Sequence, residues 1–215
     1  NWESDFLLSY ATLPAPLTSY YPIQPGDSIT ITNKNYPDYP VIELSNNRFS
    51  SFELNFPAFL ASKNRSVFEF GIRKLMPTKD FPLNGTLEDY YKNSLQLIDS
   101  CFKKGLIKKE YRNWIQKAVK YEYFDQLIWT SKRIDSSSFK KIFELQDLNN
   151  GLYRRVLKQY FLKIDMGGTN DYKRVFLSIN NLYKGANSDF LLTVCLIEIL
   201  KNPDSDRKKC LALFN

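Results

Sequence analysis

Basic side chains crowd the stretch between residues 103 and 120. Gathered on one surface, they would bind anions such as nucleic-acid phosphates, acidic glycans or lipid head groups. The candidate anion surface consists of Lys104, Lys108, Lys109, Arg112 and Lys120. Charges at this spacing are also typical of the solvated face of a helix, and we favour that interpretation. Because no RNP-type, zinc-finger or helix-turn-helix pattern accompanies them, we predict no specific nucleic-acid binding.

Other residue types that carry chemistry are missing or scattered. The chain has no histidine, which excludes Ser-His-Asp and Cys-His nucleophiles and His-Glu-x-x-His zinc sites. Its three cysteines stand far apart without a C-x-x-C pair, and they are Cys101, Cys195 and Cys210. The carboxylates considered for a glycosidase pair show no marked spacing, and they are Glu53, Glu69, Glu88 and Asp89. We therefore predict no catalytic, metal-binding or cofactor-binding residue in this chain and expect no activity of its own.

The character of the chain changes near residue 83. Nine of the ten prolines lie in residues 1–83, which carry 7 basic and 8 acidic residues. Residues 84–215 carry 23 basic and 15 acidic residues, so the net charge of +7 originates there. We predict a domain boundary at this point, between a small β-rich region at 1–83, incomplete at its start, and a helical domain at 84–215. The expected fold class is α+β: a small antiparallel β region followed by a larger all-helical bundle.

Apolar residues in the first region alternate with polar ones, which is typical of half-buried strands. This period of two is present at residues 29–31, 52–56 and 68–72. A Pro25-Gly26-Asp27 turn precedes the first of them. These patterns predict a small antiparallel sheet.

The second region has helical periodicity. Thr86 and Asp89 resemble a capping box, and Gly105 stands where a helix C′ glycine is expected. A second helix should run from about residue 108 to 129, forming an antiparallel hairpin with the first and burying Trp114 in its apolar stripe. Further helices are predicted at 137–147, 151–165, 170–184, 187–201 and 204–214. No segment reaches the roughly 18 consecutive apolar residues of a membrane span, so we predict no transmembrane segment.

One segment is similar to a known family. Residues 20–31 read YYPIQPGDSITI, which resembles the PGDSITI strand-turn-strand near the start of exported TlpA/ResA-type thioredoxin-like proteins of Bacteroidetes. In that family a small β domain and a helical region precede the thioredoxin domain. The helical hairpin at 95–123 and the segments at 153–154 and 189–192 fit the same pattern.

The resemblance implies a periplasmic or cell-envelope setting and an exported protein. The family's chemistry resides in a C-x-x-C pair on a thioredoxin fold, and this chain has neither. The chain opens at Asn1 without a signal-peptide pattern, which fits a mature or trimmed product. The implied role is a non-catalytic N-terminal module that binds or positions protein partners or a C-terminal thioredoxin domain, with the redox domain outside this chain.

Two other classes of function stay open. One is a stand-alone periplasmic protein that binds an anionic glycan or lipid through the basic helical face. The other, weaker one is a hydrolase that uses carboxylates without a recognisable motif.

We predict that the purified chain does not reduce disulfides by itself. Turnover in thiol–disulfide exchange requires a resolving thiol beside the attacking one, and the three cysteines are widely separated in sequence. An insulin-reduction assay with dithiothreitol should give the rate of the buffer control. Faster reduction that disappears on Cys→Ser substitution would contradict the prediction.

Overall fold

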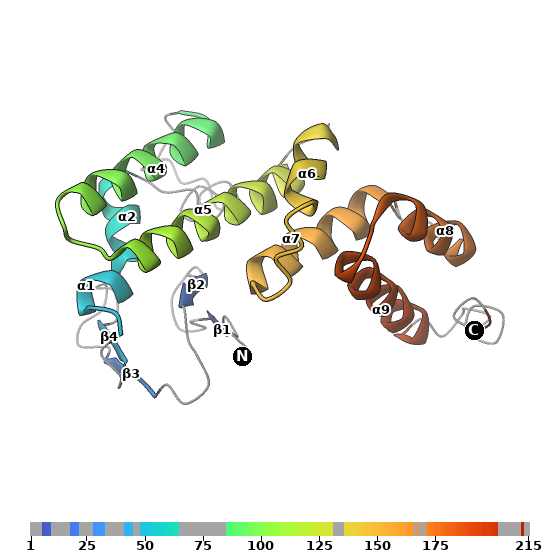
Figure 1. The fold of residues 1–215 in the computed structure, drawn as a ribbon, viewed down its shortest axis with the longest axis horizontal. Helices are drawn as coiled ribbons and strands as arrows, with labels where there is room; N and C mark the ends of the chain where they lie inside the picture. Colours follow the sequence, from blue (N-terminus) through green and yellow to red (C-terminus); the bar gives the residue numbers. More distant parts are fainter. Residues whose placement is uncertain are drawn as a thin grey trace, which may run out of the picture. The chain divides into compact units, whose positions relative to one another are not determined.

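The chain forms two compact units (Figure 1). The computed structural model describes residues 6–9, 18–21, 28–32, 41–44, 48–64, 85–130, 136–165, 167, 171–201 and 212. Unit 1 comprises Asn1–Leu127 with Asn149–Leu152, and unit 2 comprises Ile128–Leu148 with Tyr153–Asn215. The boundary predicted near residue 83 falls in a stretch outside the described residues and stays a prediction.

The strands are short and form two separate antiparallel ladders. β1 (Phe6–Ser9) pairs with β2 (Thr18–Tyr21), and β3 (Ile29–Thr32) pairs with β4 (Val41–Leu44). A lone two-stranded ladder is marginally stable in water and does not by itself form a layer of the fold. The predicted α+β class, with an antiparallel β region beside a helical bundle, is therefore wrong, because the described part of the chain is mainly helical.

Residues 52–56, whose alternation predicted a strand, are helical. They belong to α1 (Ser51–Leu54) and α2 (Phe56–Asn64). Ser50 caps α1: its Oγ accepts from the Glu53 N–H at 3.2 Å, and Glu53 Oε2 accepts from the Ser50 N–H at 2.8 Å. The ring of Phe52 contacts those of Phe56 and Phe59, four and seven residues ahead, so the helical period was present as well. The strand predicted at 68–72 lies outside the described residues.

The predicted helical hairpin is confirmed in unit 1, with α4 (Leu87–Lys103) followed by α5 (Lys109–Thr130). The capping box of Thr86 and Asp89 is present, with the Thr86 N–H donating to Asp89 Oδ2 at 2.7 Å. Gly105 adopts φ +70° beyond the C-terminus of α4. The N–H groups of Gly105 and Leu106 donate to the carbonyl oxygens of Phe102 and Cys101, each at 3.0 Å. This is a Schellman motif, and it ends α4 so that α5 can begin at Lys109, six residues after the last residue of α4.

Side-chain bonds fix the antiparallel register of α4 and α5. Asp99 Oδ1 accepts from Arg112 Nε and Nη2 at 2.9 and 2.8 Å, and Glu88 Oε2 accepts from the Tyr123 hydroxyl at 2.5 Å. From the first pair to the second, the residue on α4 lies eleven positions earlier and the residue on α5 lies eleven positions later, as antiparallel helices require. Trp114, predicted to be buried in the stripe of α5, is half-buried.

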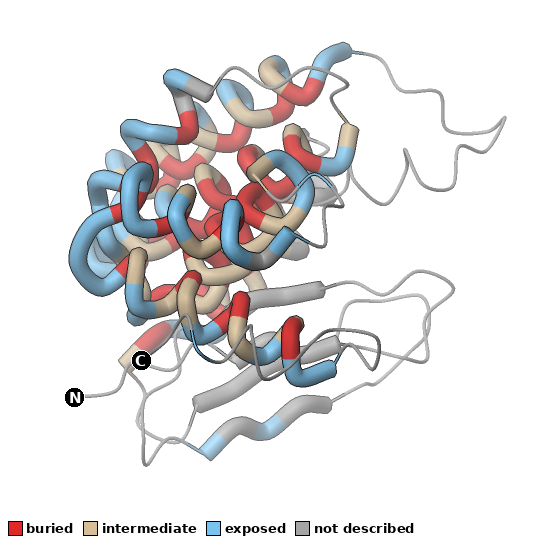
Figure 2. The backbone as a smooth tube through the Cα atoms, turned by 90° about the vertical axis from the view of Figure 1, so that its right-hand side faces the viewer, coloured by how far each residue is buried: buried red, intermediate tan, exposed pale blue. Residues whose placement is uncertain are grey.

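Unit 2 contains the later helices, which are α6 (Ser136–Phe143), α7 (Gly151–Tyr160), the π-helical turn η1 (Phe161–Asp165), α8 (Tyr172–Leu182) and α9 (Ala186–Lys201). α8 and α9 pack as a helical hairpin (Figure 1). Buried positions follow the inner faces of the helices, as Figure 2 shows. Apart from Ala212, the helix predicted at 204–214 lies outside the described residues. Within the described ranges, no helix has the length and apolar character needed to cross a bilayer.

We expect Glu53→Gln to lower the free energy of unfolding by about 1–3 kcal/mol, as loss of buried charged hydrogen bonds does. Glu53 is 1% exposed, and its two oxygens accept from the backbone N–H groups of Ser50 and Lys108. A glutamine presents an amide NH₂ to one of these donors. Urea denaturation measures the change, and Glu110→Gln, the same substitution at an exposed position, should stay within about 0.5 kcal/mol. Equal effects of the two substitutions would contradict the anchoring role of Glu53.

Candidate functional site

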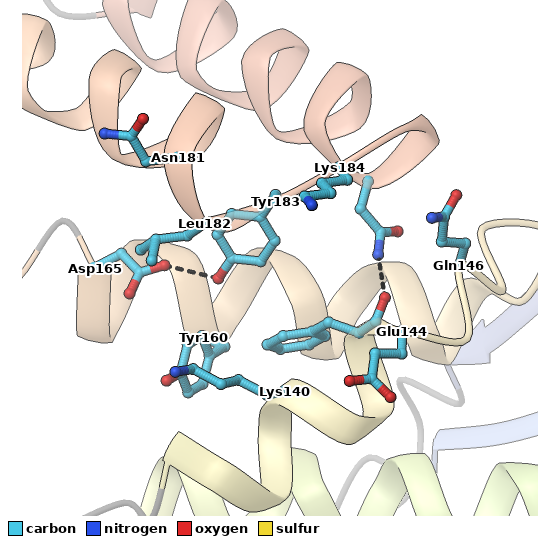
Figure 3. A pocket seen from close by; sticks show the side chains of 11 residues that line it. Lys140, Glu144, Gln146, Tyr160, Asp165, Asn181, Leu182, Tyr183 and Lys184 are labelled. Atoms are coloured by element: carbon cyan, nitrogen blue, oxygen red, sulfur yellow. Dashed lines mark hydrogen bonds between the residues drawn. The ribbon is translucent and has the colours of Figure 1, made fainter.

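A cavity of about 580 Å³ lies within unit 2 (Figure 3). Its size falls in the usual range of small-molecule sites, about 300–1,000 Å³. The end of α6 and the turn after it form one side, and α7 with η1 forms the next. The end of α8 and the start of α9 close the remainder. The cavity is thus built mainly from helix ends, where backbone direction changes and side chains from separate elements converge.

Three buried aromatic rings form the apolar wall of the cavity. The ring of Phe143 meets that of Tyr160 edge-on at a centroid distance of 5.1 Å, and it lies 5.8 Å from the ring of Tyr183. Phe139 stacks behind Tyr160 at 4.7 Å, outside the lining. The rings therefore support one another and present a rigid apolar surface.

A buried polar network holds the junction of α6 and α9. Asn187 Nδ2 donates to the carbonyl oxygen of Phe143 at 2.6 Å and to the hydroxyl of Tyr153 at 2.7 Å. Burial raises the pKa of Tyr153 to about 12, so its hydroxyl stays protonated. Because Phe143 is the last residue of α6, its carbonyl is one that the helix leaves unpaired, and the amide of Asn187 satisfies it.

Two carboxylates line the cavity: Glu144 is exposed, and Asp165, the last residue of η1, is half-buried. Oδ2 of Asp165 accepts from the hydroxyl of Tyr183 at 2.7 Å, which Figure 3 marks by a dashed line. Desolvation raises the pKa of Asp165 above its ordinary value, and this effect exceeds the opposing effect of the Tyr183 hydrogen bond. Burial and the nearby carboxylate raise the pKa of Tyr183. Within the described part of the chain, no lysine or arginine pairs with Asp165.

Backbone irregularities converge on the same cavity. η1 is a π-helical turn, a rare conformation that often occurs at functional sites. Gln146 has a left-handed φ of 48°, and Gly185 has φ +58°. A Cβ atom added at Gly185 would lie 2.9 Å from Oε1 of Gln146, so glycine permits the close approach of the two loops. Strained backbone of this kind is retained where the surrounding structure imposes it, commonly at binding sites.

The candidate anion surface is spread along the hairpin of unit 1. Lys104 and Lys109 are exposed, and Lys120 is half-buried. Lys108 Nζ donates to the carbonyl oxygen of Arg48 at 2.7 Å. Arg112 forms the salt bridge with Asp99 that fixes the register of the hairpin, and its guanidinium also lies over the ring of Phe102. The guanidinium thus already has an anionic partner, and Lys120 lies about 12 Å further along the axis of α5.

The carboxylates considered for hydrolysis serve structural roles where they are described. Glu53 and Asp89 belong to capping boxes, and Glu88 accepts from Tyr123. Among the described residues, no three histidine, cysteine, aspartate or glutamate side chains gather as a metal site would require. Glu69 lies outside the described residues.

The described cysteines are poor nucleophiles. Cys101 and Cys195 are both buried thiols, outside any disulfide. Burial raises the pKa of Cys101, and the opposing influence of Lys104 is smaller. A thiol with a raised pKa has little thiolate at neutral pH, and the thiolate is the reactive form. Cys210 lies outside the described residues.

Comparisons of the chain with protein-family models, with curated proteins and with solved structures give no match.

The residues of this cavity were not singled out from the sequence. Residues 151–165 were predicted as one helix. The available signal was the placement of Asp165 and Tyr183 directly before glycine-containing breaks, at Gly167 and Gly185. This signal places polar and aromatic residues at two helix ends, but no pattern in the sequence shows that the two ends lie close together in the fold.

We expect Asp165→Asn to make unit 2 more stable than the wild type at neutral pH. The folded-state pKa of Asp165 is above its unfolded value of about 3.9. Between these two values the folded protein binds more protons than the unfolded chain, so stability falls as pH rises through that window. Asparagine removes this penalty and can still accept from Tyr183. Urea denaturation at pH 3.5 and pH 7 should show a difference in favour of the variant that grows with pH.

The matched control is Asp189→Asn, the same change at an exposed carboxylate in the first turn of α9. If Asp165→Asn destabilised the protein at pH 7 more than Asp189→Asn, the carboxylate would be a stabilising element and our interpretation of its burial would fail.

Proposed function

We propose that this chain is a non-catalytic binding and positioning module of a cell-envelope thioredoxin-like protein, and that it holds its ligand in the cavity of unit 2. The setting is suggested by the resemblance of residues 20–31 to the exported TlpA/ResA-type proteins. The observation that carries the binding role is the cavity itself. It combines a rigid aromatic wall with a few polar groups, which is the composition of small-molecule and side-chain binding sites.

The chemistry of the lining favours binding over catalysis. Asp165 and Tyr183 are a hydrogen-bonded pair of titratable groups, and the raised pKa of Tyr183 keeps that phenol protonated at neutral pH. A general acid or base works best when its pKa lies near the operating pH. Among the described residues of the lining there is no cysteine, serine or threonine that could act as a nucleophile.

The anionic-ligand alternative has less support from geometry. A dedicated anion site uses convergent arginines or helix N-termini. In the hairpin of unit 1 the guanidinium of Arg112 is bound to Asp99, and Lys108 Nζ is bound to a carbonyl oxygen. We therefore propose the cavity, and not the basic face, as the place where the ligand binds.

A thermal-shift screen tests the binding role. We expect at least one class among small amines, carboxylates, sugars and phosphates to raise the melting temperature of the wild type, since a ligand at 100 times its Kd stabilises the folded state by about 2.7 kcal/mol. Glu144→Trp places an indole on an exposed residue of the lining and should abolish the shift. Lys173→Trp, on an exposed position of α8 outside the lining, should retain it.

Two results would count against the proposal. Equal shifts in all three proteins would place the ligand elsewhere, and no shift with any class would remove the binding role. The reading frame of the gene tests the setting separately: we expect a C-x-x-C pair after Asn215, and its absence from the encoded protein would contradict the thioredoxin partner.

A further inference from the structure

We infer that the cavity of unit 2 binds an alkylammonium group, that is, a primary amine cation on an aliphatic stem, with its charge beside Asp165 and its stem against the rings of Phe143, Tyr160 and Tyr183. The inference rests on the proposed binding role of the cavity and names the class of ligand. The same chemistry is offered by a free small amine and by a lysine side chain of a partner protein.

The sign of the ligand's charge follows from the burial of the charged residues. Asp165 is half-buried, whereas the lysines that line the cavity, Lys140 and Lys184, are exposed. A hydrated lysine head group gains little from a ligand anion, because water screens exposed ion pairs. A half-buried carboxylate without a described cationic partner has lost part of its hydration. A cation placed beside it compensates for that loss by its attraction to the negative charge.

Asp165 has the hydrogen-bonding capacity for such a cation. Tyr183 occupies Oδ2 of Asp165, and no described residue donates to Oδ1. A carboxylate oxygen accepts readily from an ammonium group, and such charged bonds are among the stronger ones in proteins. The bond from Tyr183 also fixes the orientation of the carboxylate, since its donor sits on the residue that ends α8.

The rings favour an organic cation over a metal ion. Hard metal ions take about six to eight oxygen ligands, usually with several carboxylates among them, and no three histidine, cysteine, aspartate or glutamate side chains gather among the described residues. Aromatic faces attract organic cations through the ring quadrupole and also cover an aliphatic stem. The three rings and the half-buried carboxylate of Asp165 match both parts of an alkylammonium ligand.

The two exposed lysines set a limit on the ligand. They repel a cation, so the ammonium group is expected at the end of the cavity formed by η1 and the end of α8, where Asp165 and Tyr183 lie together (Figure 3). In Figure 3 the side chains of Lys140 and Lys184 come from other elements than Asp165 does. Because water screens these exposed charges, replacing Lys184 by alanine should change binding of the cation only slightly.

Isothermal titration at pH 7 with n-pentylamine tests the inference. We expect saturable binding to the wild-type chain, with n-pentanol and pentanoate giving none. Asp165→Asn should weaken binding by about tenfold or more, as loss of a partly desolvated charge partner does. Asp189→Asn, the same substitution at an exposed carboxylate outside the lining, should change it by less than about twofold. Lys184→Ala should change amine binding by less than about twofold, because water screens its exposed charge.

A second arm distinguishes the source of the amine. The peptide acetyl-Gly-Lys-Gly-amide should bind if the cavity takes a lysine side chain, and its Nε-acetylated form should not. Binding of n-pentylamine without binding of the peptide assigns the cavity to free amines. Unchanged amine binding in Asp165→Asn, with the variant folded by circular dichroism, overturns the inference.

The remaining outcomes separate the two proposals. Preference for pentanoate over n-pentylamine, lost in Glu144→Trp, overturns the inference and leaves the binding role intact. Absence of binding in every arm overturns the inference, and absence of any ligand in the wider thermal-shift screen removes the proposed function as well.

Discussion

The carboxylate of Glu53 is the contact on which the arrangement of unit 1 depends. One oxygen accepts from the backbone and hydroxyl of Ser50, and so caps α1. The other accepts from the Lys108 N–H at 2.7 Å, across 55 residues of sequence, at the point where α5 begins. A single buried charge therefore satisfies unpaired N–H groups at two helix starts. With this link in place, Tyr111 of α5 meets the rings of Phe49 and Phe56. The same carboxylate thus caps α1 locally and joins α1 to the start of α5.

Features that depend on neighbouring residues could be predicted from the sequence. The capping box at Thr86, the glycine after α4 and the hairpin itself follow from signals within a few residues of each other. The failure at residues 52–56 has a physical reason of the same kind. Apolar residues there satisfy both a period of two and a helical period, and the Ser50–Glu53 capping box decides between them. The capping box is visible in the sequence, so it predicts a helix that starts at residue 51 even though the apolar pattern alone does not.

Features that depend on distant residues could not be predicted in this way. In the sequence Arg112 belongs to a run of basic residues that suggests an anion site. In the fold its guanidinium binds Asp99, thirteen residues away on the facing helix. The cavity of unit 2 joins the end of α6, η1, the end of α8 and the start of α9, and no local pattern states that these four meet. A burial-dependent property, such as the raised pKa of Asp165, arises only from that meeting.

Both tryptophans of the described residues lie on α5, one on each side of the division between the two units, and they differ in exposure. Trp114 is half-buried in unit 1 and its ring lies 5.4 Å from that of Tyr111. Trp129 belongs to unit 2, is 59% exposed and has the ammonium of Lys163 over its ring. The two indoles differ in polarity of surroundings, so their emission maxima differ, with that of Trp129 nearer to the value in water. A variant that keeps Trp114 as its single indole, with Trp2 and Trp129 replaced, therefore follows the unfolding of unit 1 by fluorescence, because the emission of a half-buried indole moves toward its value in water when the surrounding structure unfolds.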